Sequence, residues 1–161
     1  MELRLYSFVN FYLSPMQKGI QTGHAAVDLM LKYSLGKLST SQEFSRQQKM
    51  VYDWAEDHKT FIVLEGGNSK SLLQTTKIIA DSDFPYDTFC EDRDSLNGLH
   101  TCTAVVLPDF IFAAKLDSNG NFYYFDSPVM ESDSPFMEAK IRPDDQNYDI
   151  IKLVTSSRLA A

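Results

Sequence analysis

The sequence is poor in the residues that build metal centres and disulfide frameworks. Its 161 residues include only two cysteines, Cys90 and Cys102, and three histidines. No Cys-x-x-Cys pair occurs, so the two cysteines are expected to be reduced, half-buried thiols of a cytosolic protein. A zinc site would need all three histidines, or carboxylate partners, at spacings that the sequence does not show. We therefore expect neither a bound metal nor a cofactor.

Long hydrophobic runs are also missing. No apolar stretch approaches the roughly 20 residues that a membrane helix needs. The first residues, Met1-Glu-Leu-Arg-Leu, lack the basic-then-apolar layout of a secretory signal. These absences predict a cytoplasmic protein without a membrane partner.

Positive charge is scarce. There are 15 Lys and Arg residues against 22 Asp and Glu residues, for a formal net charge of −7, and the basic residues are scattered. Binding of duplex nucleic acid or tRNA draws much of its affinity from Lys and Arg side chains that neutralise phosphates. The composition therefore disfavours a large nucleic-acid partner, whereas it leaves a small ligand open.

What the sequence does contain is a strand-to-helix transition at Ser14-Pro15, after the apolar run from Leu3 to Leu13. Pro fits the first helical turn, and Ser can cap it. Two stripes follow at helical spacing. One is apolar (Ile20, Ala25 or Val27, and Leu31), and the other is polar (Gln17, Gln21, His24 and Asp28). The polar stripe is either a solvated face or a ligand face, at a helix start whose N–H groups suit an anion.

The segment Gln21-Thr-Gly-His24-Ala-Ala resembles the Gln-x-x-His-Ala-Ala motif of the peptidyl-tRNA hydrolase II family. The order of predicted elements over residues 2–110 is similar too. The resemblance implies an α/β fold with a mixed β-sheet flanked by helices, with residues 1–110 as the family-like core, and the length of 161 residues predicts a single domain, 1–161. Its strands are expected within 3–13, 54–64, 84–93 and 100–107, with helices from Ser14 and over Ser69 to Ala80.

Two departures from the family bear on catalysis. The family places a Lys seven residues before the motif His, where this chain has Gln17; Lys18 is one step on, about 100° around the helix. The family's Arg-Thr-Gln segment is missing after Glu91-Asp-Arg-Asp94. A neutral amide cannot stabilise developing negative charge as a cation can. If the chain were a hydrolase, the resemblance would assign catalysis to His24, Lys18 and Asp92.

Further candidate ligand residues come from strand ends and loops. Asn10 closes the first predicted strand and either contacts a ligand or caps a turn. Asn68, after Gly66-Gly67, either helps to cradle an anion or caps a helix. His58-Lys-Thr60 and His100-Thr-Cys102 suggest the paired His-x-Ser/Thr motifs of two-histidine phosphoesterases, but the second motif is incomplete because Cys102 takes the place of the hydroxyl residue. The ligand residues predicted overall are Asn10, Gln17, Lys18, Gln21, His24, Asn68, Asp92, Arg93, His100 and Thr101. His24 could instead be a core histidine.

Beyond residue 110 the resemblance ends. Aromatic runs at Phe110 to Leu116 and Asn121 to Phe125 flank a turn, which predicts an added C-terminal β-hairpin. A long surface loop is expected over 126–147, followed by a closing helix or strand over Asp149 to Leu159. An exposed aromatic hairpin would form an extra sheet edge, a lid or a contact in a homo-oligomer.

Three functions remain open. The first is non-catalytic binding of a small nucleotide-like ligand, because the phrase from Phe8 to Thr22 resembles small phage-encoded relatives of the family. That likeness suggests an anti-defence protein that sequesters a host nucleotide signal. The second is peptidyl-tRNA hydrolysis. The third is a protein-interaction module that uses the aromatic hairpin.

Overall fold

A mixed four-stranded β-sheet forms the centre of the protein, with strand order β2-β1-β4-β3. The structure is a computed structural model that describes residues 1–33, 45–116, 119, 121–125, 138–141 and 145–160. β1 and β2 are parallel, whereas β4 runs antiparallel to both of its neighbours, β1 and β3. The expected mixed α/β architecture is thereby confirmed. The strands are β1 (Leu3–Asn10), β2 (Thr60–Gly67), β3 (Tyr86–Cys90) and β4 (His100–Pro108).

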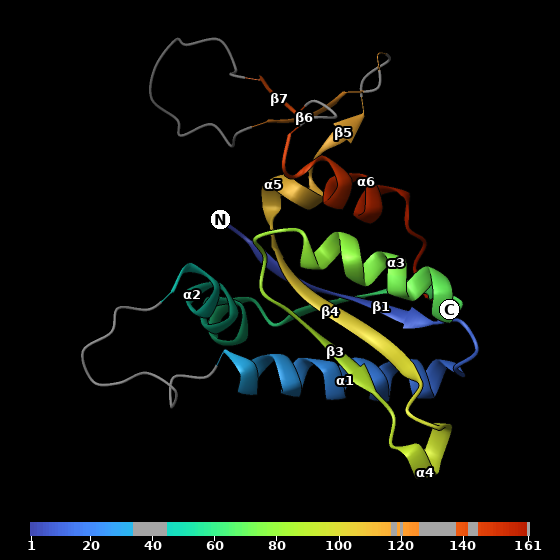
Figure 1. Cartoon of the computed structure of the whole chain (residues 1–161). Coiled ribbons are helices and arrows are strands. Elements are labelled where there is room, and N and C mark those ends of the chain that lie inside the picture. The colour runs from blue at the N-terminus through green and yellow to red at the C-terminus, as the bar shows by residue number, and fades with distance from the viewer. Residues whose placement is uncertain (34–44, 117–118, 120, 126–137, 142–144, 161) are drawn as a thin grey trace.

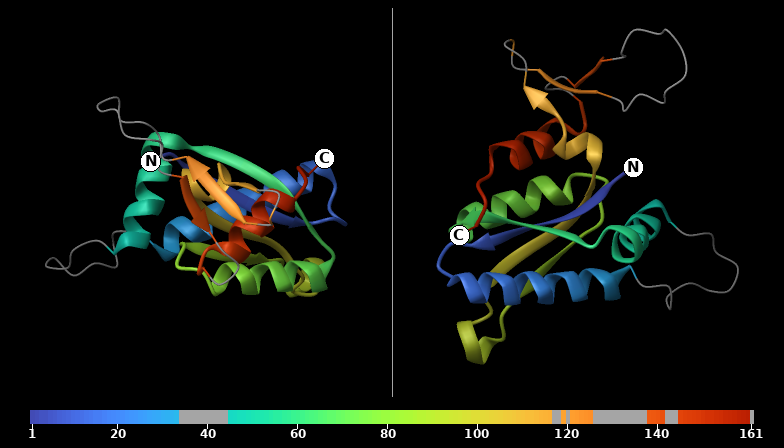
Figure 2. Two further views of the ribbon diagram at one scale, coloured as in Figure 1. Left: turned by 90° about the horizontal axis from the view of Figure 1, so that it is seen from above. Right: turned by 180° about the vertical axis from the view of Figure 1, so that it is seen from behind.

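Two long helices cover opposite faces of this sheet (Figure 1). Helix α1 (Pro15–Lys32) covers one face, and helix α3 (Ser69–Ala80) covers the other. Helix α2 (Arg46–Asp53) runs directly into a π-helical turn, η2 (Trp54–His58), that leads into β2. Helix α6 (Tyr148–Ser156) packs outside α3 (Figure 2). Where the expected second strand began at Trp54, the chain is therefore helical, and β2 begins only at Thr60.

Strand β1 is shorter than the apolar run that predicted it. The run extends to Leu13, but the strand ends at Asn10. The Asn10 side-chain oxygen accepts a hydrogen bond from the Tyr12 N–H at 3.2 Å, and the Leu13 N–H donates to the Asn10 carbonyl at 3.3 Å. These bonds close a turn that competes with further strand pairing. The turn-capping interpretation of Asn10 is thus the one that its contacts support.

Helix α1 faces the sheet with a different stripe from the one expected. Ile20, Val27 and Leu31, predicted as apolar positions of the helix, lie on its solvent side. Its buried residues are Lys18, Gln21, Thr22, Ala25, Ala26 and Leu29. Three of these are polar, and the alanines allow the helix to lie close against the strands. Periodicity identified a stripe correctly but could not say which stripe contacts the sheet.

The segment after β4 forms a second, small sheet with order β5-β6-β7. Residues 109–112, where the first hairpin arm was expected to begin, are helical (α5, Asp109–Phe112). Strand pairing therefore starts only at β5 (Lys115–Leu116), which lies antiparallel to β6 (Phe122–Phe125). Strand β7 (Glu138–Ile141) falls in the stretch predicted as a loop and pairs with β6. The small sheet thus has one strand more than a hairpin would have.

The C-terminal segment forms the helix that was considered for it and, in place of a strand, a single β-bridge between Leu159 and Leu64. Helix α6 ends at Ser156, and the chain then runs along the edge of β2. The Glu65 N–H donates to the Arg158 carbonyl, and the Ala160 N–H donates to the Val63 carbonyl, each at 2.9 Å. This pairing covers part of an otherwise open strand edge. Gly36 and Ser39 to Ser41, residue types that favour the end of one helix and the start of the next, lie outside the described residues.

Candidate functional site

Two irregularities lie at one end of the strands of the sheet, where β1, β2 and β3 finish and β4 begins. We refer to this end of the strands as the sheet edge beside α1. Along β1 and β2, Val9 pairs with Glu65 but Asn10 pairs with Gly67, so Gly66 is an extra residue. A Cβ atom at Gly66 would lie 2.8 Å from the Leu72 side chain and 2.9 Å from the Val9 carbonyl oxygen, which leaves room only for glycine. β-Bulges of this kind are frequent beside binding sites, where they redirect side chains.

The second irregularity turns Thr101 towards α1. Phe89 pairs with Cys102 and Cys90 pairs with His100, so Thr101 is the extra residue of β4. Its buried hydroxyl lies 3.3 Å from the Gln21 side-chain oxygen, to which it donates, and 3.4 Å from the Phe89 carbonyl oxygen. Regular alternation along β4 would have placed Thr101 on the same face as Thr103, which contacts α3.

Gln21 is the centre of the resulting polar cluster. Its side chain is only 5% exposed, although it lies on the second turn of a helix. Its amide nitrogen donates a short hydrogen bond to Glu91 Oε1, and its oxygen accepts the bond from Thr101. Both ends of the amide are thereby fixed by residues that follow or begin a strand. The sequence predicted Gln21 and Thr101 as ligand residues, and the structure brings them together.

His24 lies one helical turn beyond Gln21 and stacks on Phe89 of β3. The two ring centroids are 4.7 Å apart, and the ring planes are tilted by 12°. His24 nevertheless belongs to the exposed residues. Phe89 covers one face of the His24 ring, so the solvent-exposed part of His24 is the remainder of its imidazole. The core-histidine alternative does not describe this arrangement.

Lys18 is the buried cation of the same helix. Its side chain is 9% exposed, and its ammonium nitrogen lies 2.6 Å from Glu65 Oε1 at the end of β2. Gln17, which the resemblance aligned with a Lys of the peptidyl-tRNA hydrolase II family, is exposed, and its side chain accepts a hydrogen bond from the Ser14 N–H at 3.0 Å. Gln17 therefore belongs to the helix cap, whereas Lys18 points into the protein.

Both long helices begin with a side-chain cap. The Ser14 hydroxyl accepts the Gln17 N–H of α1, and the Asn68 side chain accepts the Ser71 N–H of α3 at 2.9 Å. A capped helix start offers fewer free N–H groups to an anion. Asn10 extends this second cap, because its amide nitrogen donates to Ser69 Oγ at 3.3 Å. Asn10, Gln17 and Asn68 thus make contacts that shape the backbone.

His100 lies on the other side of the sheet from Gln21. Its Nε2 atom is 2.9 Å from the Thr103 hydroxyl and 3.0 Å from the Cys102 carbonyl oxygen, and Thr103 in turn contacts Thr76 of α3 at 2.7 Å. Burial lowers the pKa of His100, with a smaller opposing effect from the Cys102 carbonyl. His58 lies in η2 and not on a strand, so the two histidines do not form the phosphoesterase pair.

Asp92 and Arg93 are exposed residues at the start of the short helix α4 (Arg93–Leu96). Asp92 makes no capping hydrogen bond there. Glu91, the residue before Asp92, is the acid of this segment that contacts Gln21. The ligand prediction omitted Glu65, Phe89 and Glu91, which hold Lys18, His24 and Gln21. All three lie at strand ends, which was the only signal that could have found them.

A second polar group lies deeper under α1. Ser7 and Thr22 are buried, and their hydroxyls have no hydrogen bond of normal geometry. Both lie beside the Cys102 thiol, whose pKa is raised by burial to about 12. At neutral pH this thiol is protonated, so it is not a nucleophile. Cys102 is fully buried and Cys90 is exposed, which differs from the half-buried pair expected.

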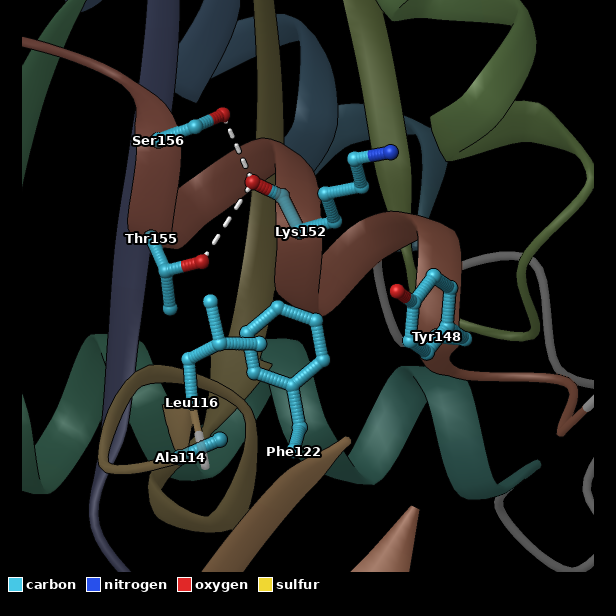
Figure 3. A pocket seen from close by; sticks show the side chains of 7 residues that line it. All are labelled: Ala114, Leu116, Phe122, Tyr148, Lys152, Thr155 and Ser156. Atoms are coloured by element: carbon cyan, nitrogen blue, oxygen red, sulfur yellow. Dashed lines mark hydrogen bonds between the residues drawn. The ribbon is translucent and has the colours of Figure 1, made fainter. Parts of the chain in front are cut away.

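A pocket of about 380 Å³ lies away from this edge, between α6 and the small sheet (Figure 3). None of the predicted ligand residues lines it. The hydroxyls of Thr155 and Ser156 both donate to the Lys152 carbonyl oxygen within α6. The residues that line the pocket are Ala114, Leu116, Phe122, Tyr148, Lys152, Thr155 and Ser156.

Among the residues that the structure describes, no group of three or more His, Cys, Asp or Glu side chains could hold a metal ion. Nor does the described part of the chain contain a helix with the length and apolar character needed to cross a bilayer. Comparison of the sequence with protein-family models and with curated proteins finds no match.

Proposed function

We propose that the sheet edge beside α1 binds a small ligand that carries a nucleobase, and that it does so without converting the ligand chemically. One observation carries this proposal: a buried amide that makes two side-chain hydrogen bonds lies beside a pair of stacked rings. Gln21 is held between Glu91 and Thr101, and His24, one turn on, is backed by Phe89. An amide has a second N–H and a second oxygen lone pair, and in a side chain held in this way these groups would read the hydrogen-bonding edge of a base, while aromatic rings receive its face.

The electrostatics of the edge favour a base over a polyphosphate. Three carboxylates, those of Glu65, Glu91 and Asp92, accompany the cations Lys18 and Arg93. Exocyclic amino groups of a base are donors that match Glu91 and the Gln21 oxygen. A chain of phosphates would instead meet repulsion and two capped helix starts. A nucleoside or a nucleotide of low charge is therefore the class of ligand that suits the site.

The contacts of the three residues that hydrolysis would need also favour binding. Lys18 is already paired with Glu65, His24 stacks on Phe89, and Asp92 is exposed at the start of α4. To stabilise an oxyanion, Lys18 would have to leave its carboxylate partner. With the likeness of residues 8–22 to phage-encoded relatives, sequestration of a host nucleotide signal is the role that we propose for such binding.

The test begins with mass spectrometry of small molecules released when protein purified from cells is denatured. We expect a base-containing compound in stoichiometric amount, released intact. The Gln21→Ala variant should release little of it, because the amide that reads the base is gone. The matched control is Gln74→Ala, which removes an exposed amide from the outer side of α3.

Two results would contradict the proposal. One is the absence of any base-containing compound together with no binding of nucleosides or nucleotides. The other is equal release from the Gln21 and Gln74 variants. Turnover of an aminoacyl-ester substrate that disappears in Asp92→Asn would support the hydrolase in place of the binder.

A further inference from the structure

A stripe of apolar side chains runs along the outer face of α1, bordered by the exposed His24 about 20° around the helix from Leu31. Four large side chains on it are mainly exposed: Met16 by 78%, Ile20 by 49%, Val27 by 58% and Leu31 by 61%. At 100° per residue they fall within a stripe about 60° wide, opposite the residues that contact the sheet. In a chain in which 23% of residues are charged, a stripe of four large apolar side chains without a charge is a candidate contact surface.

The middle of this stripe has no side chain. Gly23 lies between Ile20 and Val27, and a Cβ atom built on it would meet no heavy atom within 4 Å. The same is true of Gly19, one turn earlier. Neither glycine is required by packing within the chain, and each lowers helix stability by roughly 1 kcal/mol relative to alanine. What the glycines do provide is a place where another helix can approach closely, because interaxial distance depends on the side chains at the contact.

The stripe is also complementary to itself. In an antiparallel pair with a twofold axis between residues 23 and 24, Met16 of one copy meets Leu31 of the other, and Ile20 meets Val27. We propose that the outer face of α1 is the contact of a symmetric homodimer, with two α1 helices crossing at Gly23. The occupant is thus a second copy of this chain. This inference does not rest on the proposed ligand.

The area of the stripe determines how stable the proposed dimer is expected to be. The four side chains expose on the order of 400 Å² of apolar surface, as much as the largest patch of a typical monomer. With Gly19 and Met30 at one margin, a helix pair covers on the order of 500 Å² per copy, less than the roughly 800 Å² per partner of a standard stable interface. The dimer is therefore weak, with a dissociation constant in the micromolar range or above.

The test is sedimentation equilibrium over about a hundredfold range of protein concentration. The mass of the wild-type protein should rise from monomer towards dimer and no further. Gly23→Arg should hold it at the monomer, because the new side chain enters the helix contact while the monomer has room for it. Ile20→Glu should weaken the dimer about tenfold or more, which corresponds to about 1.4 kcal/mol. Leu73→Arg, on the exposed side of α3, is the matched control and should dimerise like the wild type.

A rescue variant separates the proposed register from a general loss of apolar surface. In Ile20→Glu combined with Val27→Lys, opposite charges meet across the twofold axis twice, so dimerisation should recover relative to either single variant. The proposal is overturned if the wild type stays monomeric throughout, if Gly23→Arg still dimerises, or if Leu73→Arg is as disruptive. Failure of the double variant to recover would overturn the antiparallel register.

Discussion

Helices α1 and α3 cover the two faces of one sheet, but α1 buries more polar side chains than α3 does. Helix α3 turns Leu72 and Ile79, both fully buried, towards the strands. Helix α1 turns Lys18, Gln21 and Thr22 inward and leaves large apolar side chains in solvent. The first arrangement is what the hydrophobic effect alone would produce. The second requires partners for every buried polar group, which Glu65, Glu91 and Thr101 partly supply.

This difference indicates a division of roles. Burying apolar side chains stabilises a fold, whereas burying an amide or an ammonium group costs free energy unless it is fully bonded. Departures from local rules concentrate at functional sites. We therefore assign stability mainly to the α3 side of the sheet, ligand binding to the inner side of α1 with His24 at its margin, and self-association to the outer side of α1, which His24 borders.

The largest change in stability is expected on the α3 side. Leu72→Ala removes a fully buried side chain and leaves a cavity, which should lower the free energy of unfolding by about 2–5 kcal/mol. Leu73→Ala, at the next position but 64% exposed, should change it by less than about 0.5 kcal/mol. Urea unfolding followed by circular dichroism measures both. Equal effects of the two variants would contradict the assigned orientation of α3.

A smaller effect is expected for the ion pair under α1. Lys18→Met keeps the apolar stem but leaves Glu65 without its cation, which should cost about 1–3 kcal/mol. Glu65 is 30% exposed, so water limits the penalty. In a double-mutant cycle with Glu65→Gln, the double variant should recover part of the loss, with a coupling of about 0.5–2 kcal/mol. Strict additivity would show that the two side chains do not interact.

The smallest effect is expected in how the free energy of unfolding depends on pH. Burial lowers the pKa of His100 in the folded state below its ordinary value of about 6.5. The unfolded chain then binds a proton more readily than the folded one, so stability is complete above about pH 6.5 and is lost as the pH falls through the lowered pKa. His100→Gln should flatten this part of the curve of unfolding free energy against pH. An unchanged slope in the variant would contradict the burial of His100 beside Thr103.

The sequence predicted the α3 side of the sheet better than the α1 side. For α3, the bounds Ser69 to Ala80 were predicted correctly, because its apolar spacing and its Asn68 cap are local signals. The buried side of α1 could not be predicted in this way. Lys18 and Gln21 find their partners 47, 70 and 80 positions further along the chain, at Glu65, Glu91 and Thr101.

The predicted ligand residues divide for a related physical reason. Gln21, His24 and Thr101 gather at one edge, whereas His100, adjacent to Thr101 in sequence, lies on the opposite face of the sheet. Neighbouring strand residues alternate between faces, and the single extra residue in β4 decides which face each takes: without it, Thr101 would face α3 and His100 would face α1. No sequence pattern marks this bulge, since neither Thr101 nor Cys102, which share it, is a glycine. Strand alternation alone would therefore have misplaced Thr101.

The most direct test of the binding site is calorimetric titration of three proteins with the common nucleosides and their 5′-monophosphates. In His24→Phe the stacking ring is kept, and in His24→Ala it is lost. Base stacking is worth about 1–3 kcal/mol, so the compound that binds the wild type should bind His24→Phe with similar affinity. It should bind His24→Ala about tenfold to a hundredfold more weakly. Affinity that is unchanged in His24→Ala, or the absence of binding to any of these compounds, would contradict a nucleobase site at the edge of this sheet.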